Sequence, residues 1–289
     1  MSRTSRMHRS WHHFAAATRF ALIEHGRNRF AMVLVALFVP TWITLAHLVI
    51  ARAPVQFRLR ATGEMLRASG NELSQISGAL NAATLIIGFM MFAATFVSGD
   101  FDRRLAMAGY PRLHLLLAKV TALVIASLAV AVYATAITCQ YWSPRRPWLL
   151  VVGLFCAAMT YGAFGVTLGA LLKREVEGMF TIVMISILDL SLQNPIPNPA
   201  ADSDFIAYLP SYGAMQASTA AGFSTTVPLA DLFLQLAWFI AAALLAFLVF
   251  HRRTRSALPA ALVAAPIPAQ AAAWGAPGAP VATNAVDQA

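Results

Sequence analysis

The stretch from Trp148 to Leu172 reads WLLVVGLFCAAMTYGAFGVTLGALL and contains no charged side chain. About 20 consecutive apolar residues in a helix cross the ~30 Å hydrocarbon core of a bilayer. This stretch is therefore long and apolar enough to span a membrane. The rest of the 289-residue chain agrees, because 59% of its residues are hydrophobic and only 11% are charged. Soluble domains carry about 25% charged residues, so the composition predicts a membrane protein.

Working outward from this stretch, five more apolar segments qualify as spanning helices or come close to it. We therefore predict an all-α polytopic membrane protein with six transmembrane helices. The fifth helix is the weakest, because it is short, begins near Glu175 and carries Asp189. The predicted transmembrane domain covers residues 30–250, with spans at Phe30–Ala51, Ile76–Val97, Leu115–Thr138, Trp148–Leu172, Glu175–Leu192 and Leu232–Phe250.

Lysine and arginine residues indicate orientation, because they collect in the short loops on the cytoplasmic side. If both termini are cytoplasmic, 15 of the 21 Lys and Arg residues lie on that side. No Lys or Arg occurs between Arg174 and Arg252, so residues 193–231 are predicted to form an extracellular loop. The first outer loop counts against this orientation, because it contains four arginines (Arg52, Arg58, Arg60 and Arg67). We predict a multi-pass protein of the plasma or inner membrane.

The two ends of the chain differ from the spans. Within residues 1–29, Trp11, Phe14, Thr18 and Leu22 recur at helical spacing beside basic residues. This pattern favours an amphipathic helix in the cytoplasmic interface, although a merely basic tail fits the same residues. Residues 251–289 are rich in Ala and Pro and are expected to be a disordered cytoplasmic tail. The net charge of +9 is spread between apolar runs, which indicates membrane-flanking anchors rather than nucleic-acid binding.

Residues 99–112 form the most informative cytoplasmic segment. Asp100 could cap a short helix whose first turns hold Asp102, Arg103 and Arg104, and Gly109 and Pro111 would end it. Such a charged helix, tied between two spans, could pass movement from a partner protein into the membrane. A solvated loop whose arginines only fix the orientation fits the same residues.

Few polar groups inside the predicted spans are candidates for function. Asp189 could line a substrate path, or it could be a carboxylate near the interface that is hydrogen-bonded to a neighbouring helix. His47, near the outer end of the first span, has the same two interpretations. Cys139 and Cys156 are most simply small core residues, and they provide no structural zinc set.

Missing motifs exclude several functions. The sequence has no G-x-x-x-x-G-K-[ST] motif, so the chain does not bind ATP through a P-loop of its own. No span pairs carboxylates with Lys or His, which argues against a carrier driven by a proton relay. Neither H-E-x-x-H nor G-x-S-x-G occurs, so a membrane hydrolase lacks its usual chemistry. If the protein moves a compound uphill, the energy comes from another polypeptide.

The order of these features resembles the membrane subunit of type-2 ABC transporters. The resemblance covers roughly residues 10–255 and includes an interfacial helix, six spans, a charged inner loop after the second span and a large outer loop before the sixth. Local patterns similar to the family are Arg27–Phe30 (RNRF), Asp102–Leu113 (DRRLAMAGYPRL), Phe164–Lys173 (FGVTLGALLK) and Tyr208–Met215 (YLPSYGAM).

The resemblance implies a permease subunit without catalysis of its own. A cytoplasmic ABC ATP-binding dimer would hold ATP and Mg and would dock on the 99–112 loop, through Asp100, Asp102, Arg103 and Arg104. A second permease subunit, identical or homologous, would complete the pathway. Export of a hydrophobic or amphipathic compound (a drug, antibiotic, peptide or lipid) is the expected activity. The alternatives are a membrane anchor or sensor that transports nothing and a membrane enzyme that modifies lipids.

Overall fold

Long helices dominate the structure, a computed structural model that describes residues 15–23, 26–27, 29–60 and 62–254. Residues 15–23 are helical, which agrees with the amphipathic helix predicted there, and residues 1–14 and the predicted tail after 254 lie outside the described residues. The other elements are α2 (Arg29–Val49), β1 (Pro54–Leu59), β2 (Glu64–Ser69), α3 (Gly70–Met107), α4 (Arg112–Tyr141), α5 (Pro147–Leu171), α6 (Glu175–Gln193), the 3₁₀ helix η1 (Asp204–Tyr208), α7 (Tyr212–Phe223) and α8 (Leu229–Thr254).

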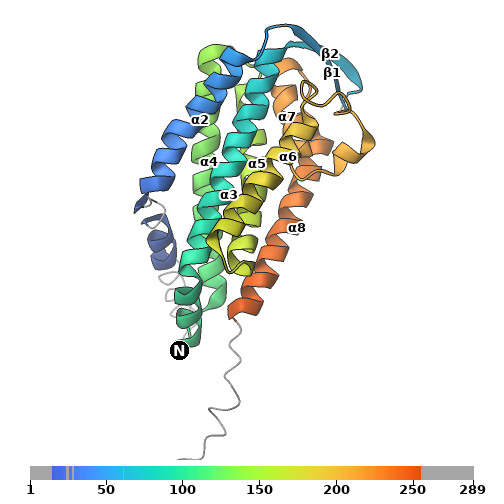
Figure 1. Ribbon diagram of the computed structural model, residues 1–289. Coiled ribbons are helices and arrows are strands. Elements are labelled where there is room, and N and C mark those ends of the chain that lie inside the picture. The colour runs from blue at the N-terminus through green and yellow to red at the C-terminus, as the bar shows by residue number, and fades with distance from the viewer. Residues whose placement is uncertain (1–14, 24–25, 28, 61, 255–289) are drawn as a thin grey trace, which may run out of the picture. The chain divides into compact units, whose positions relative to one another are not determined.

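The helices form a bundle around a central pair, α3 and α5 (Figure 1). These two helices approach closely because glycines of α5 lie against the backbone of α3. A Cβ atom on Gly165 would collide with the carbonyl oxygen of Gly88, and one on Gly169 would lie 2.7 Å from the carbonyl oxygen of Phe92. Small residues spaced four apart are a common way for membrane helices to pack backbone to backbone.

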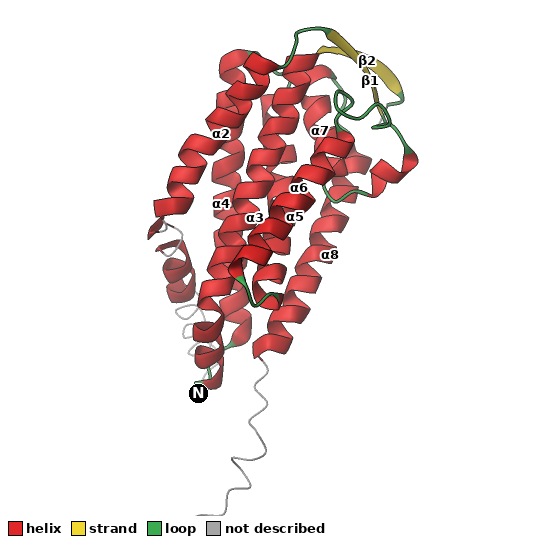
Figure 2. Ribbon diagram, in the orientation of Figure 1, coloured by secondary structure: helices red, strands yellow, loops and turns green. Residues whose placement is uncertain are grey.

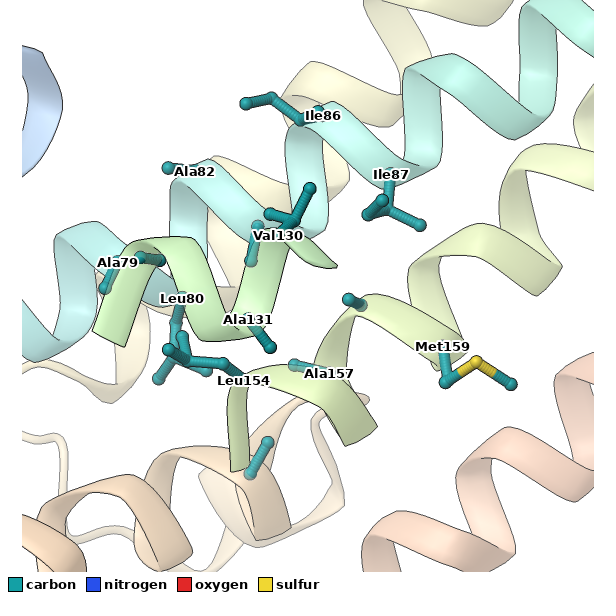
Figure 3. Close-up of a cluster of buried hydrophobic side chains, with 14 of the residues drawn as sticks. Ala79, Leu80, Ala82, Ile86, Ile87, Val130, Ala131, Leu154, Ala157 and Met159 are labelled. Carbon is teal, nitrogen blue, oxygen red and sulfur yellow. The ribbon is translucent and has the colours of Figure 1, made fainter. Parts of the chain in front are cut away.

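The hydrophobic core lies where α3, α4 and α5 meet. Figure 3 shows part of this cluster, in which Leu80 and Ile87 of α3 come together with Val130 of α4 and Leu154 of α5. All four side chains are at least 96% buried. Interiors of this kind are close-packed, so the central helices are held in a fixed arrangement.

The outer helices present apolar side chains on the surface of the bundle. Leu37 and Leu48 of α2 are 63% and 73% exposed, and Phe233 and Leu244 of α8 are 68% and 58% exposed. Such surfaces are costly in water but match the hydrocarbon of a bilayer. Among the described residues, five helices are long and apolar enough to cross a membrane, namely α2, α3, α4, α5 and α8. They correspond to five of the six predicted spans.

α6, the predicted fifth span, is not one of those five helices. It begins at Glu175 and carries Glu177 and Asp189, which lower its hydropathy. One face of α6 is buried against the bundle, mostly against α3, and the opposite face exposes Phe180 and Leu188. The sixth crossing therefore stays a prediction, although the helix itself is present.

The structure corrects the expected helix and loop boundaries in the 99–112 segment. There is no separate helix capped by Asp100, because α3 continues without a break to Met107. No strong helix breaker lies between the predicted span and this point, so the helix ends only at Gly109. Gly109 adopts a φ of 87°, and the amide of Tyr110 donates to the carbonyl oxygen of Leu105 at 3.0 Å. This is the pattern of a Schellman motif, and Pro111 follows it, as the sequence predicted.

Two predicted loops contain regular structure. In the first outer loop, β1 and β2 form an antiparallel hairpin, with Phe57 opposite Leu66 (Figure 2). The inward side chains Phe57 and Ala68 pack against Leu73 of α3. The predicted extracellular loop 193–231 contains α7, which is buried because small residues let it lie against α5 and α8. Gly213 is one of them, since a Cβ there would collide with the Asp231 carbonyl oxygen.

The two ends of the bundle are named here by their connections. The hairpin end holds residues 50–69, 142–146 and 194–228. The turn end holds residues 108–111 and 172–174. The predicted functional residues Asp100, Asp102, Arg103 and Arg104 are near the turn end, whereas Asp189 and His47 are near the hairpin end.

Candidate functional site

The last turns of α3 extend beyond the membrane. α3 has 38 residues, which at 1.5 Å per residue make a helix about 57 Å long, whereas the hydrocarbon core is ~30 Å thick. The end of α3 and the turn at residues 108–111 therefore reach out of the bilayer at the turn end. Partial burial raises the pKa of the Tyr110 phenol in this turn.

The predicted docking residues do not share one surface. Asp100 and Arg104 are exposed and lie four residues apart, on the same face of α3. Phe101 is 63% exposed beside them, and Val97 is 71% exposed one turn earlier. Asp102 points the other way and is only 6% exposed, so it is not available to a partner protein. The backbone of Arg103 belongs to α3, and its side chain is outside the described part of the structure.

Asp102 instead joins α3 to α4 through a buried ion pair. The Lys119 ammonium lies 3.0 Å from Asp102 Oδ2, and the two side chains are 11% and 8% exposed. Lys119 also donates to Ser98 Oγ at 2.7 Å, and the Ser98 hydroxyl lies 3.2 Å from Asp102 Oδ2. A buried ion pair is stable only if its geometry is good and further hydrogen bonds satisfy the charged groups. Here Ser98 Oγ lies within hydrogen-bond distance of both Lys119 and Asp102. We name the set of Ser98, Asp102 and Lys119 the α3–α4 clamp.

The sequence contained a signal for this clamp. Asp102 and Lys119 lie at similar distances on either side of the Gly109 turn. When two antiparallel helices are joined by a short turn, residues at similar distances from the turn lie at the same level along the helix axes. What the sequence did not show is that both side chains point into the helix interface.

Asp189 is buried and engaged by three donors. Its side chain is 3% exposed at the hairpin half of α6. The Tyr161 hydroxyl donates to Asp189 Oδ2 at 2.6 Å, the Ser211 amide donates to the same oxygen at 3.1 Å, and Gln193 Nε2 donates to Oδ1 at 2.6 Å. The carboxylate thus ties α6 to α5 and to the residue before α7. One interpretation of the sequence was a carboxylate hydrogen-bonded to a neighbouring helix, and these contacts agree with it. A role of Asp189 in a cargo path stays a prediction.

Hydrogen bonds between other, neutral polar residues also connect helices within the bundle. Gln235 of α8 donates to Thr160 Oγ1 at 2.8 Å and accepts from the Ala214 amide at 3.0 Å. Ser186 of α6 lies 2.8 Å from Thr84 Oγ1, and Asn194 Nδ2 donates to Ser77 Oγ at 3.1 Å. Buried polar groups are normally paired in this way. These residues were not predicted from the sequence, because single neutral polar side chains inside apolar spans give no distinct signal.

His47 also has polar and aromatic neighbours at the hairpin end. Gln75 Nε2 lies 3.0 Å from His47 Nδ1, and the imidazole stacks on Tyr141 with ring centroids 4.6 Å apart. Tyr141 in turn lies 2.6 Å from Thr44 Oγ1 through its hydroxyl. These contacts connect α2, α3 and α4. In the part of the chain that the structure describes, no group of three or more His, Cys, Asp or Glu residues could hold a metal ion.

The helical bundle and its apolar surface define a multi-pass membrane protein. The family model described as ABC-2 family transporter protein matches residues 48–251, which is well over half of the chain. The chain therefore belongs to the ABC-2 family of transporter proteins, and it is the membrane component of an ABC transporter. The resemblance seen in the sequence is confirmed at the level of the family. No curated protein matches the chain.

Proposed function

We propose that this protein is the permease subunit of an ATP-driven exporter that carries a hydrophobic or amphipathic compound. Family membership supports a transport role. The sequence lacks a P-loop motif, so ATP and Mg belong to a separate ATPase subunit. Apart from Asp189, Asp231 and the α3–α4 ion pair, the buried side chains of the described bundle are apolar or neutral polar groups. Such an interior suits a drug, antibiotic, peptide or lipid better than a polyanion or a sugar chain.

The turn end is cytoplasmic in this proposal, and the hairpin end faces outside. The distribution of Lys and Arg supports this orientation. The four arginines that counted against it are in or next to the ordered hairpin, so they belong to a folded element instead of a short flexible loop. The charge of one of them, Arg60, is offset by Asp202 at 3.2 Å and Asp204 at 3.0 Å.

The observation that carries the proposal is the geometry at the end of α3. Val97, Phe101, Asp100 and Arg104 form an exposed surface that combines apolar and charged groups; we call it the docking surface. The α3–α4 clamp lies behind it and holds this segment to α4. A force applied to the docking surface is therefore passed to two helices together, and through α3 to the close-packed α5. The partner would be a cytoplasmic ABC ATP-binding dimer, and a second permease subunit, identical or homologous, would complete the pathway.

Co-purification with the ATPase subunit tests the proposal. The chain would be expressed together with a candidate ABC ATPase subunit and reconstituted in liposomes, where ATP hydrolysis is measured with and without candidate cargo. The double variant Phe101→Ala/Arg104→Glu should lose both the ATPase subunit and cargo-stimulated hydrolysis. The double variant Met65→Ala/Arg67→Glu is the matched control, because it likewise removes one exposed apolar side chain and reverses one exposed arginine, but on the hairpin.

Two results would count against the proposal. Normal co-purification and normal stimulation in Phe101→Ala/Arg104→Glu would show that the docking surface is wrong. Failure of the unchanged chain to bind any P-loop protein would favour the membrane anchor or sensor.

A further inference from the structure

The 3₁₀ helix η1 presents two aromatic side chains side by side. Phe205 is 71% exposed and Tyr208 is 75% exposed, whereas Ile206 between them is only 4% exposed. Side chains three residues apart eclipse one another in a 3₁₀ helix, so both rings project from the same face of η1. Ile206 anchors the opposite face in the protein. Two large exposed rings side by side form an apolar patch, and such patches mark contacts with protein or membrane.

The loop that carries η1 is bonded to the hairpin and to the end of α6. Arg60 of the hairpin bridges Asp202 and Asp204, at 3.2 Å and 3.0 Å, and also donates to the Asp202 carbonyl oxygen at 2.5 Å. At the start of the loop, Asn198 Nδ2 donates to the Leu192 carbonyl oxygen at 2.6 Å. The aromatic pair is therefore presented on a braced segment.

The position of the loop indicates what covers these rings. The segment between α6 and α7 projects sideways beyond the helices and lies below the hairpin in the view of Figure 1. It therefore overhangs the side of the bundle that lipid contacts. The apolar surface of α6 reaches Leu188 and Leu192, which are 53% and 38% exposed, and that of α8 begins at Leu229, which is 62% exposed. The aromatic pair is thus next to the border of the lipid-facing belt.

We propose that η1 is a membrane-interface anchor, with Phe205 and Tyr208 inserted among the lipid headgroups and upper acyl chains at the hairpin end. Aromatic side chains concentrate at this depth, because the ring is apolar and the Tyr hydroxyl still reaches polar partners. The anchor fixes the height of the loop that leads directly into α7. The bridge from Arg60 offsets the charge of Asp202 and Asp204, which would otherwise oppose contact with a lipid surface.

Spin labelling tests this anchor in the full chain reconstituted in phosphatidylcholine liposomes. In a Cys139→Ala/Cys156→Ala background, a nitroxide is attached at Phe205→Cys or Tyr208→Cys, and at Met65→Cys as the control. Met65 is 59% exposed on the outward face of the hairpin. We expect the ratio of oxygen accessibility to accessibility by a water-soluble nickel complex to be several-fold higher at 205 and 208 than at 65.

Two results would overturn the proposal. A ratio at 205 and 208 equal to that at 65 would place η1 in water. Low accessibility to both reagents would show that protein covers the rings, as a second copy of the chain would. Lipids brominated near the headgroup provide an independent measurement that needs no nitroxide. The chain already has six tryptophans, so the emission that Phe205→Trp adds to that of the parent chain is measured. This added emission should be quenched by the brominated lipids, and added emission that is not quenched would also contradict the anchor.

Discussion

Replacing Lys119 with methionine removes the cation from the α3–α4 clamp and leaves Asp102 buried without it. The two side chains are only 11% and 8% exposed, and their charged atoms lie 3.0 Å apart. Breaking a buried ion pair by removing one partner costs about 3–5 kcal/mol. Asp102 keeps the Ser98 hydroxyl at 3.2 Å, and the clamp is near the end of the bundle. We therefore expect Lys119→Met to lower the free energy of unfolding by about 3 kcal/mol, the lower limit of that range.

The double variant Asp102→Leu/Lys119→Met should recover most of this loss. Replacing both charges with apolar groups removes the buried charge together with its partner, which is often neutral or stabilising. The assay is the free energy of unfolding in detergent micelles titrated with sodium dodecyl sulfate and followed by circular dichroism. Arg104→Met is the control, because Arg104 is exposed on the same segment and its loss should change stability by less than about 0.5 kcal/mol. A single variant as stable as the parent, or a double variant as unstable as the single, would refute the clamp.

Four further changes probe other parts of the bundle. Tyr161→Phe removes one of the three donors to Asp189 and should lower the free energy of unfolding by about 1.5–3 kcal/mol, the range for hydrogen bonds to charged groups, in the same assay. Asp189→Asn should alter cargo preference in reconstituted transport if the carboxylate lines the path, whereas unchanged transport of every tested cargo would leave it a structural role only. Gly165→Ala places a Cβ against the backbone of α3 and should abolish the folded monodisperse protein in size-exclusion chromatography, whereas Gly26→Ala, which meets nothing within 4 Å, should be tolerated. Arg60→Gln should cost less than about 1 kcal/mol, because its ion pairs are partly exposed, yet hydrogen exchange in the loop between α6 and α7 should become faster while α5 is unchanged.

The candidate site could be predicted from the sequence only in part. The sequence predicted a charged connection with a short helix of its own around Arg104, whereas the structure makes this segment the last turns of α3. The break at Gly109 followed from the conformational freedom of glycine. The direction of each side chain was not predictable. Asp100 and Asp102 look alike in the sequence, but two residues along a helix turn a side chain to the opposite side. Asp100 therefore meets solvent, and Asp102 meets Lys119.

The sequence by itself determined that this protein lies in a membrane and where along the chain its long apolar helices lie. Hydropathy is a local sum over about 20 residues, so the uncharged stretch from Trp148 to Leu172 is sufficient to place a spanning helix, which the structure has at Pro147–Leu171. Only the tertiary structure decided which polar groups meet. Two of the three partners of Asp189 come from other segments, namely α5 and the residue before α7. α7 is helical inside a predicted loop because its small residues fit against α5 and α8. Such contacts depend on how helices face one another, and that is a property of the packed bundle that no single stretch of sequence contains.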